Sequence, residues 1–495
     1  MSAKITQALE NQVFSSGSTW IPLEFLKKKG FCMDEIVQAV KLRSLIYYCM
    51  DGVKYLTNYA LHTAENEISI HTMRILAEQP KPVSEFYLNN TIKKAEKELG
   101  LSFHAQQSNG IKMAIRNNFC IITGGPGTGK TCVLNGIHFV LKSLNPYANI
   151  VYMAPTGKAA SRITESTGNE ASTLHKKLRI TESNMNPTKV KADAIIVDEI
   201  SMLDTFVAAA LFKAVESGTK LILVGDVDQL PSVGPGAVLR DFIDSGVIPV
   251  TQLTKTFRQA NDSNLFKNIQ YLQHAYPYLE DGEDFHLYYK DPKKENVVEA
   301  MLAEYRKMTK KYGNDNVVCL MPYRKAGILC SNNMNKRIQA MVNPSAPYFK
   351  YKDGYFKLND PVMQLVNREE CANGDVGKIV KITSDGIVVR FFEKTVFYDE
   401  DDMEQIALAY AMSIHKSQGS EYKAVITCLF AEHETMLQRN LVYTAVTRAK
   451  QECSLFTQPE VIQKAIETDG SDLRFTLLPD KLVYQRKRLK IAYNI

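Results

Sequence analysis

The feature that most constrains this chain is residues 121–131, Ile-Ile-Thr-Gly-Gly-Pro-Gly-Thr-Gly-Lys-Thr. Three apolar or β-branched residues lead a strand into a glycine-rich turn, and Lys130-Thr131 begins a helix. This is the G-x-x-x-x-G-K-[ST] pattern in the strand–loop–helix context that it requires. Glycines let the backbone wrap closely, so that N–H groups and the helix N-terminus face a triphosphate. The motif therefore predicts a nucleotide-binding loop.

Each part of the motif has an expected role toward a bound nucleotide. We expect Lys130 to reach the β- and γ-phosphate oxygens and the Thr131 hydroxyl to bind Mg²⁺. The loop residues expected to cradle the phosphates are Gly125, Pro126, Gly127, Thr128 and Gly129. ATP and Mg²⁺ are therefore the predicted cofactors.

The composition is that of a soluble globular protein, with 45% apolar and 23% charged residues. A chain of 495 residues is too long for one hydrophobic core and predicts about three domains. It has no apolar run of the roughly 20 residues that cross a membrane and no apolar signal core at its N-terminus. Nine scattered cysteines without a C-x-x-C pair disfavour disulfides and zinc. We expect a cytoplasmic protein, either nucleoid-associated or in an infected host if the source is viral.

The pattern along the chain changes at several points. Residues 1–95 show helical periodicity, which predicts a helical N-terminal domain. Residues 96–255 alternate short β-rich runs with helices, which implies a parallel sheet, and a second such region covers 256–345 and 405–482. Residues 346–404 read as short alternating strands, which predicts a small antiparallel β-barrel inserted into this α/β domain. Residues 483–495 form a basic tail, read as a solvated end in preference to a phosphate-binding one.

Polar residues follow two apolar runs downstream of the loop. Asp198 and Glu199 end the run 195–197, and a buried parallel strand places such residues at the ligand edge of its sheet. We expect Asp198 to hold Mg²⁺ and Glu199 to orient and deprotonate the attacking water. Gln229 follows the next run and is placed to sense the γ-phosphate through its amide.

Two adjacent residues further along the chain supply an aromatic ring and a positive charge. Phe257 is expected to stack on the base, and Arg258 to neutralise charge in the transition state. The plain alternative is a surface arginine beside a core phenylalanine. The net charge of +6 permits a polyanionic partner without proving one.

The order and the residues of these motifs resemble those of the superfamily-one DNA helicases, and most of all those of their RecD-like 5′→3′ branch. Residues 225–239, 321–344 and 373–377 are typical of that branch, and the similarity runs from about residue 101 to 482. The resemblance implies two RecA-like motor domains with ATP in a cleft between them, where Arg448 would supply a catalytic charge. It implies an ATP-dependent motor that moves 5′→3′ on single-stranded DNA and unwinds duplex, in repair, recombination or replication.

The resemblance also assigns individual residues. Gln107 matches the glutamine that reads adenine, and Glu421 matches the acid that contacts ribose. His175 is as readily structural as functional. The residues that match strand-contacting positions are Pro155, Thr156, Lys158, Ser172, Thr173, His175 and His415. Members of the family carry a short hairpin before the Asp-Glu strand, and here the candidate wedge is about 176–192, with a turn near 184–187; the alternative is a plain surface connection.

The expected partners follow from this function. They are single-stranded DNA and single/double-strand junctions, with single-strand-binding or nuclease proteins as further partners, no membrane, and a monomeric motor. Pro361 stands where a basic residue is common in the family, which weakens the expectation that the barrel contacts DNA. Two alternatives remain open: a motor subunit of a larger nuclease complex, and a DNA-dependent ATPase that remodels protein–DNA complexes.

Overall fold

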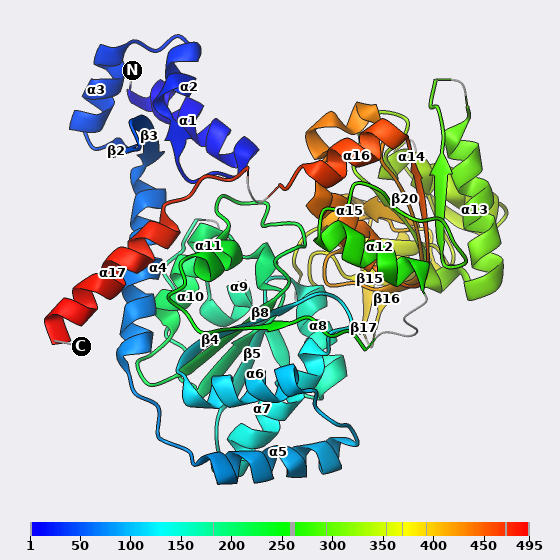
Figure 1. Cartoon of the computed structure of the whole chain (residues 1–495). Coiled ribbons are helices and arrows are strands. Elements are labelled where there is room, and N and C mark those ends of the chain that lie inside the picture. The colour runs from blue at the N-terminus through cyan, green and yellow to red at the C-terminus, as the bar shows by residue number, and fades with distance from the viewer. Residues whose placement is uncertain are drawn as a thin grey trace. The chain divides into compact units, whose positions relative to one another are not determined.

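The structure, a computed structural model, describes residues 2–181, 183–257, 263–293, 295–352, 354–368, 370–392, 394–470 and 473–493. The chain divides into two compact units (Figure 1). The first unit contains Met1–Pro155, Ile163–Phe257 and Gly470–Ile495, and the second contains Thr156–Arg162 and Arg258–Asp469. Among the described residues, no helix combines the length and the apolarity that a bilayer crossing requires.

The first unit is built on a six-stranded parallel sheet of order β6-β5-β7-β8-β4-β9. Its strands are β4 (Phe119–Gly124), β5 (Ile150–Ala154), β6 (Ala171–Thr173), β7 (Ala194–Val197), β8 (Lys220–Gly225) and β9 (Val250–Leu253). Its helices are α6 (Ala105–Arg116), α7 (Lys130–Leu144), α8 (Gly157–Thr167), α9 (Leu174–Leu178), η1 (Ile200–Met202), α10 (Thr205–Ala214) and α11 (Val238–Asp244). The central strands are buried on both faces, which explains their continuous apolar runs.

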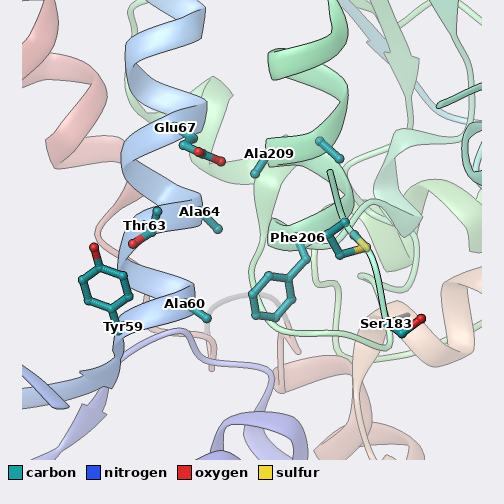
Figure 2. A pocket seen from close by; sticks show the side chains of 10 residues that line it. Tyr59, Ala60, Thr63, Ala64, Glu67, Ser183, Phe206 and Ala209 are labelled. Carbon is teal, nitrogen blue, oxygen red and sulfur yellow. The ribbon is translucent and has the colours of Figure 1, made fainter. Parts of the chain in front are cut away.

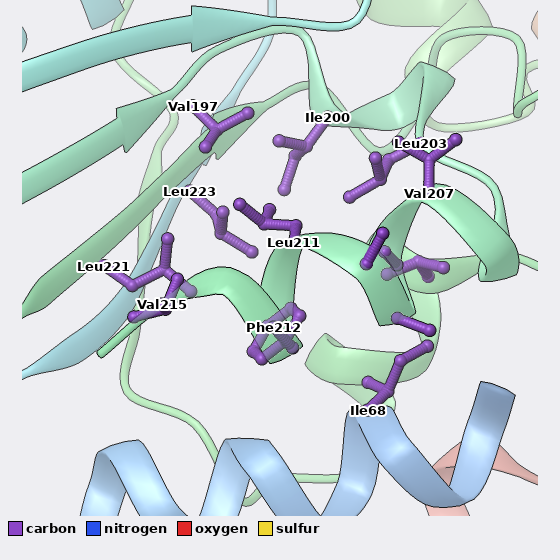
Figure 3. Close-up of a cluster of buried hydrophobic side chains, with 14 of the residues drawn as sticks. Ile68, Val197, Ile200, Leu203, Val207, Leu211, Phe212, Val215, Leu221 and Leu223 are labelled. Carbon is purple, nitrogen blue, oxygen red and sulfur yellow. The ribbon is translucent and has the colours of Figure 1, made fainter. Parts of the chain in front are cut away.

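The core of this unit lies between the sheet and α10. Figure 3 shows Leu211 and Phe212 of α10 close to Leu221 and Leu223 of β8, with Ile68 of α4 (Tyr59–Ala77) on the other side of α10. Phe212 also makes an edge contact with Phe119 of β4, at 5.4 Å between ring centroids. The helix α10 is therefore buried on two sides, which explains its almost wholly apolar sequence.

The N-terminal region is not helical throughout, contrary to our expectation. It contains α1 (Ser2–Ser16), β1 (Ile21–Pro22), α2 (Leu23–Lys28), α3 (Met33–Lys41), β2 (Leu45–Met50), β3 (Val53–Asn58), α4 and α5 (Glu85–Leu99). The three strands form an antiparallel sheet of order β1-β3-β2. Asp51 and Gly52 join β2 to β3 with φ angles of 49° and 78°, the left-handed pair that a tight hairpin turn requires.

The second unit contains a five-stranded parallel sheet of order β10-β21-β20-β11-β19. Its strands are β10 (Phe285–Tyr289), β11 (Val317–Met321), β19 (Ala411–Ser413), β20 (Tyr422–Cys428) and β21 (Ala449–Thr457). Its helices are α12 (Asn264–Gln273), α13 (Val297–Tyr312), η2 (Asn314–Asn316), α14 (Ser331–Val342), η4 (Ile414–Ser417), η5 (Ala431–Met436), α15 (Arg439–Thr447) and α16 (Pro459–Glu467). The predicted α/β class with two parallel sheets is confirmed.

An antiparallel insertion separates β11 from β19. It consists of the pair β12 (Tyr348–Tyr351) and β13 (Gly354–Lys357), and of a five-stranded sheet of order β17-β16-β15-β14-β18. The five strands are β14 (Pro361–Gln364), β15 (Val376–Ile382), β16 (Gly386–Phe391), β17 (Lys394–Asp399) and β18 (Ile406–Leu408), with η3 (Asp401–Gln405) before the last. Among the described residues, no pairing closes β17 onto β18, so the barrel remains a prediction.

The C-terminal residues do not follow the predicted boundaries. Residues 470–482, expected in the second motor domain, belong to the first unit, and the expected tail is part of the helix α17 (Leu478–Tyr493). Leu478 and Leu482 lie one turn apart and are buried in the same core as α4 and α10. The red helix α17 accordingly runs beside α4 in Figure 1.

Candidate nucleotide site and the loops around it

The phosphate loop joins a fully buried strand to a helix. Gly127 and Gly129 have φ angles of 74° and 82°, and Gly129 caps the N-terminus of α7. A Cβ atom on Gly129 would lie 2.2 Å from Nε2 of Gln107. Both the conformation and the lack of space therefore require glycine at position 129.

The ammonium group of Lys130 lies inside this loop. Its Nζ donates hydrogen bonds to the carbonyl oxygens of Gly124 at 2.5 Å and Gly125 at 3.0 Å. The Thr128 hydroxyl donates to Gly125 as well, at 2.8 Å. The loop thus surrounds a positive charge, with Thr131 in the first turn of the helix that follows.

Gln107 is buried against the same loop. Its Oε1 accepts from the backbone N–H of His104 at 2.9 Å, and its Nε2 donates to the carbonyl of Thr128 at 3.1 Å. The amide therefore links the start of α6 to the phosphate loop. The structure brings Gln107 to the expected place, while the reading of adenine stays a prediction.

An exposed aromatic ring adjoins the loop. The backbone N–H of Phe257 donates to the carbonyl of Gly127 at 2.8 Å, and half of the residue's surface is exposed. The ring of His104 lies 6.3 Å away, edge to face. Sequence reasoning missed His104, although its place three residues before Gln107 is that of a helix cap. Arg258, expected beside Phe257, lies outside the described residues.

The sheet register brings the other predicted residues to the same edge. Thr123 of β4 pairs with Gly225 of β8, and Val197 of β7 pairs with Leu223, so β4, β7 and β8 end together. Asp198 therefore follows β7 at the edge where the phosphate loop follows β4. Its Oδ1 accepts from the N–H of Glu199 at 2.8 Å.

Glu199 has an unusual backbone conformation. Its φ angle is 55°, in the left-handed region that costs a non-glycine residue about 1–2 kcal/mol. Strained residues of this kind cluster at functional sites, where the surrounding structure holds them. The conformation supports the choice of Glu199 as a functional carboxylate.

Gln229 is only 4% exposed, and its Nε2 donates to Oδ2 of Asp226 at 3.1 Å. Its Oε1 and the Oγ of Ser201 are buried without a hydrogen-bond partner among the described residues. Both residues line one small cavity. Buried polar atoms are nearly always paired, so these two are placed to bind an oxygen or nitrogen atom from outside the protein. Sequence reasoning missed Ser201, because none of the motifs on which it relied assigns a role to this residue.

The strand-contacting candidates of the first unit lie at the end of β5. Ser172 and Thr173 pair in register with Met153 and Ala154, which places both beside the strand end that leads into Pro155. The Thr173 hydroxyl accepts from the N–H of Lys176 at 3.2 Å and caps α9, the helix that contains His175.

Three of the strand-contacting candidates belong to the second unit, namely Thr156, Lys158 and His415. The Thr156 hydroxyl accepts from the N–H of Ala159 at 3.3 Å. The ammonium of Lys158 lies 3.3 Å from the hydroxyl of Tyr422 and 5.5 Å from the centre of its ring. Sequence reasoning missed Tyr422, because the two residues are distant in the chain. His415 lies in the short helix η4.

The two predicted charges of this unit are engaged with the protein itself. Glu421 forms ion pairs with Arg162 at 2.9 Å and with Lys450 at 3.0 Å. Arg448 is buried and donates to the carbonyls of Thr444 and Ser420, both at 3.2 Å. Neither the ribose contact nor the catalytic charge is tested by these contacts.

The candidate wedge, residues 176–192, is only partly free of the core. Ile180 and Val190 are 4% and 5% exposed. Within the predicted turn, Oδ1 of Asn184 accepts from the backbone N–H of Asn186 at 3.1 Å, and Thr181 and Asn184 exchange two backbone hydrogen bonds. Ser183 and Met185 line a cavity of about 390 Å³ together with α4 and α10 (Figure 2). Ile180 and Val190 are therefore core residues, and Met185 packs against the same core, while the wedge stays a prediction. We call residues 183–187, which lie between Ile180 and Val190, the tip.

Two family models match the chain. The AAA domain matches residues 107–235, and the UvrD-like helicase C-terminal domain matches residues 408–456. Both ranges contain predicted site residues, from Gln107 to Gln229 in the first and from His415 to Arg448 in the second.

Several known proteins are similar to the chain. It is 31% identical over 363 residues to the ATP-dependent RecD2 DNA helicase of Deinococcus radiodurans, covering 72% of this chain and 49% of that protein. It is 29% identical to the RecBCD enzyme subunit RecD of Mycolicibacterium smegmatis, covering 79% and 76%. A crystal structure of Pif1 helicase from Bacteroides with ADP-AlF3 and single-stranded DNA has a TM-score of 0.45 and 20% identity, covering 72% and 92%. The chain thus spans about half the length of RecD2.

The sequence matches to RecD2 and RecD agree with the motif order described above. They cover 72% and 79% of the chain, and the AAA domain model, at residues 107–235, includes the phosphate loop and the Asp-Glu strand. The two family models match these same motor regions. The chain is therefore similar to RecD-like helicases over 72–79% of its length.

Proposed function

We propose that this protein is an ATP-dependent DNA helicase that moves 5′→3′ along single-stranded DNA and unwinds the duplex ahead of it. The observation that carries the proposal is the phosphate loop closed around the Lys130 ammonium, at the sheet edge that also bears Asp198 and Glu199. The kinship with RecD2, which is named a DNA helicase, supports DNA as the substrate. Work on DNA would place the protein in the cytoplasm, at the nucleoid.

The residues at this edge fit ATP and Mg²⁺. The Thr131 hydroxyl and the Asp198 carboxylate offer the oxygen ligands that Mg²⁺ prefers, and they would hold the ion. A bound Mg²⁺ neutralises charge that develops on the phosphates. Lys130 would exchange its carbonyl partners for phosphate oxygens, and Phe257 would stack on the base from its half-exposed position.

Hydrolysis would depend on three side chains. The Glu199 carboxylate would orient the attacking water and accept its proton. Gln229 would accept a hydrogen bond from that water at Oε1, the buried atom that lacks a partner among the described residues. Arg448 would stabilise negative charge, as an arginine does in many phosphoryl transfers. Arg258 is proposed for the same task from the sequence alone.

The proposed DNA contacts are of the kind that bind phosphates without reading sequence. The hydroxyls of Thr156, Ser172 and Thr173 would donate to phosphate oxygens, and Lys158 would supply charge. The ring of Tyr422 beside Lys158 offers a surface for base stacking. We propose that one chain suffices for translocation.

The decisive experiment compares duplexes that carry a single-stranded tail at either the 5′ or the 3′ end. Unwinding of the 5′-tailed duplex alone, dependent on ATP and absent in Lys130→Ala, is the expected result. Unwinding from the 3′ tail would overturn the polarity. ATP hydrolysis stimulated by DNA without strand separation would favour an ATPase that remodels protein–DNA complexes.

A second candidate function is that of a motor subunit in a larger nuclease complex. It is favoured by the match to an RecBCD enzyme subunit, of which the chain covers 76%. The nuclease would be a separate protein in this case. Purification of the tagged chain with stoichiometric nuclease subunits would support this function, and full unwinding activity of the isolated chain would make a partner unnecessary.

A further inference from the structure

A segment near the C-terminal end of the chain crosses the first unit beside the sensor residue Gln229. We call residues 473–482 the strap. The carbonyl of Phe475 accepts from the backbone N–H groups of Thr19 at 3.0 Å and Trp20 at 3.3 Å. The Phe475 ring stacks on that of Tyr55, with 4.1 Å between centroids. The strap is thereby fixed to the N-terminal region of the unit.

The residue before Phe475 is bound to a different element. The guanidinium of Arg474 donates to the carbonyls of Ser232 at 2.7 Å, Gly234 at 3.1 Å and Gly236 at 2.8 Å. A guanidinium carries five donors in a rigid plane, so it can satisfy several carbonyls at once. Arg474 therefore organises the loop 232–236, which follows Gln229 almost directly.

The same loop is held from its other side by Gly17. The carbonyl of Gly17 accepts from the N–H of Gly236 at 2.8 Å. A Cβ atom on Gly17 would lie 2.5 Å from Cζ of Arg474, and the φ angle of Gly17 is 71°. The guanidinium therefore fits tightly between the N-terminal region and the loop.

The helix after the loop is tied to the strap as well. The Thr476 hydroxyl donates to Oδ1 of Asp241 in α11, at 2.7 Å. The ammonium of Lys481 forms an ion pair with the buried Glu65 of α4, at 2.9 Å. The segments on both sides of the loop thus have anchors, since Gln229 before it bonds to Asp226 and Asp241 of α11 after it bonds to Thr476.

We propose that Arg474 is a positioning residue for ATP hydrolysis, which holds Gln229 in place through the loop 232–236. The loop sequence Ser-Val-Gly-Pro-Gly has little structure of its own, so its carbonyls need an external donor to adopt one arrangement. Gln229 must present Oε1 at a fixed point to accept a hydrogen bond from the attacking water, and a loop that samples several arrangements would displace that oxygen. The inference rests on the proposed function.

The test uses Arg474→Ala, Arg474→Lys and, as a matched control, Arg486→Ala, whose guanidinium donates to the carbonyl of Gly246 at 3.1 Å. With saturating single-stranded DNA, we expect kcat of Arg474→Ala to fall about tenfold, with the KM for ATP within about threefold of wild type. Arg474→Lys should recover part of the loss, because an ammonium reaches fewer of the carbonyls. Arg486→Ala should match wild type. Rates are divided by the number of sites that bind nucleotide, which removes any misfolded fraction.

A double-mutant cycle with Gln229→Ala separates positioning from a general structural role. If Arg474 acts through Gln229, Arg474→Ala lowers kcat in the wild-type background but not further in Gln229→Ala. Equal loss in both backgrounds, or an unchanged kcat in Arg474→Ala, would overturn the inference. A wild-type protein that hydrolyses no ATP, or a Gln229→Ala variant as active as wild type, would instead overturn the function proposed for the site.

Discussion

At position 199 a charged side chain occupies a backbone conformation that favours glycine. The φ angle of Glu199 is 55°, and the residue directly follows Asp198 at the end of β7. An alanine there would keep the strain, whereas a glycine would relieve it. The fold therefore carries a local strain at the position where the proposed reaction needs a carboxylate.

The strain at Glu199 can be measured with two substitutions. We expect Glu199→Gly to be more stable than Glu199→Ala by about 1 kcal/mol, because only alanine keeps a Cβ atom in the left-handed region. Chemical denaturation of both variants gives the comparison. Both should lack ATP turnover, and an alanine variant as stable as the glycine variant would show that the backbone relaxes at this position.

The roles of Lys130 and Glu199 differ in a way that binding experiments detect. We expect both Lys130→Ala and Glu199→Gln to lose ATP turnover by at least about a hundredfold, since each removes a group that acts in the transition state. Nucleotide affinity should fall only in Lys130→Ala, because Glu199→Gln leaves the phosphate loop intact. Fluorescent nucleotide titrations measure this, and turnover near the wild-type rate in either variant would contradict the assignment.

The residues predicted from sequence and those missed differ in how their contacts are made. Gly127, Gly129 and Lys130 act within one loop, so their spacing alone predicts their geometry. Tyr422 and Arg474 act on residues hundreds of positions away, and no local pattern records such contacts. The geometry of the loop was therefore predictable from sequence, whereas the long-range contacts of Tyr422 and Arg474 were not.

Among the elements, the connection from 176 to 192 shows how a surface loop can be anchored in a core. Ile180 and Val190 are buried on either side of an exposed tip. A deletion that removed both would create a cavity and cost several kcal/mol, since large-to-small core changes cost about 2–5 kcal/mol each. A test of the wedge must therefore leave both residues in place.

We expect replacement of residues 183–187 by a Gly/Ser segment of equal length to leave ATP hydrolysis and single-strand translocation largely intact. Unwinding of a 5′-tailed duplex should fall at least about fivefold if the tip separates the strands, as its exposed polar residues allow. Stopped-flow strand separation measures the rate. A control, Val190→Ala, should lower the melting temperature without a selective effect on unwinding, and unwinding at the wild-type rate in the tip variant would place the wedge elsewhere.

Two elements were misjudged from sequence for different physical reasons. The β2–β3 hairpin carried a local signal, Asp51-Gly52 between β-branched and aromatic runs, which helical periodicity nearby obscured. The helix α17 carried no decisive local signal, because the charges of residues 486–488 resemble those of a free tail. Its place was decided by Leu478 and Leu482, which are buried against distant helices.

For the molecule as a whole, one buried carboxyl links stability to pH. Burial raises the pKa of Asp241 from 3.8 to about 8, with the nearby Glu65 and Asp244 adding to the effect and the hydrogen bond from Thr476 opposing it. Above pH 4 the unfolded carboxyl is ionised, while the folded one stays protonated up to about pH 8. The contribution of this group to the free energy of unfolding therefore falls as the pH rises from about 4 to about 8.

We expect Asp241→Asn to remove this dependence. Its stability relative to wild type should increase with pH in that window, by at most about 1.4 kcal/mol for each pH unit. Denaturation curves at pH 5, 6, 7 and 8 give the difference, in which the other titrating groups cancel. A difference that stays constant with pH would mean that Asp241 is ionised in the folded protein.

The first unit is assembled from segments on both sides of the second, and this has a consequence for biosynthesis. Residues 473–482 leave the ribosome after the whole second unit. More than two hundred residues are therefore made between the synthesis of the loop 232–236 and that of Arg474, which binds it. Domains generally fold as they emerge, which lets the second unit form first. On this order, a nascent chain carries residues 121–131 and the loop 232–236 long before Arg474 can bind that loop.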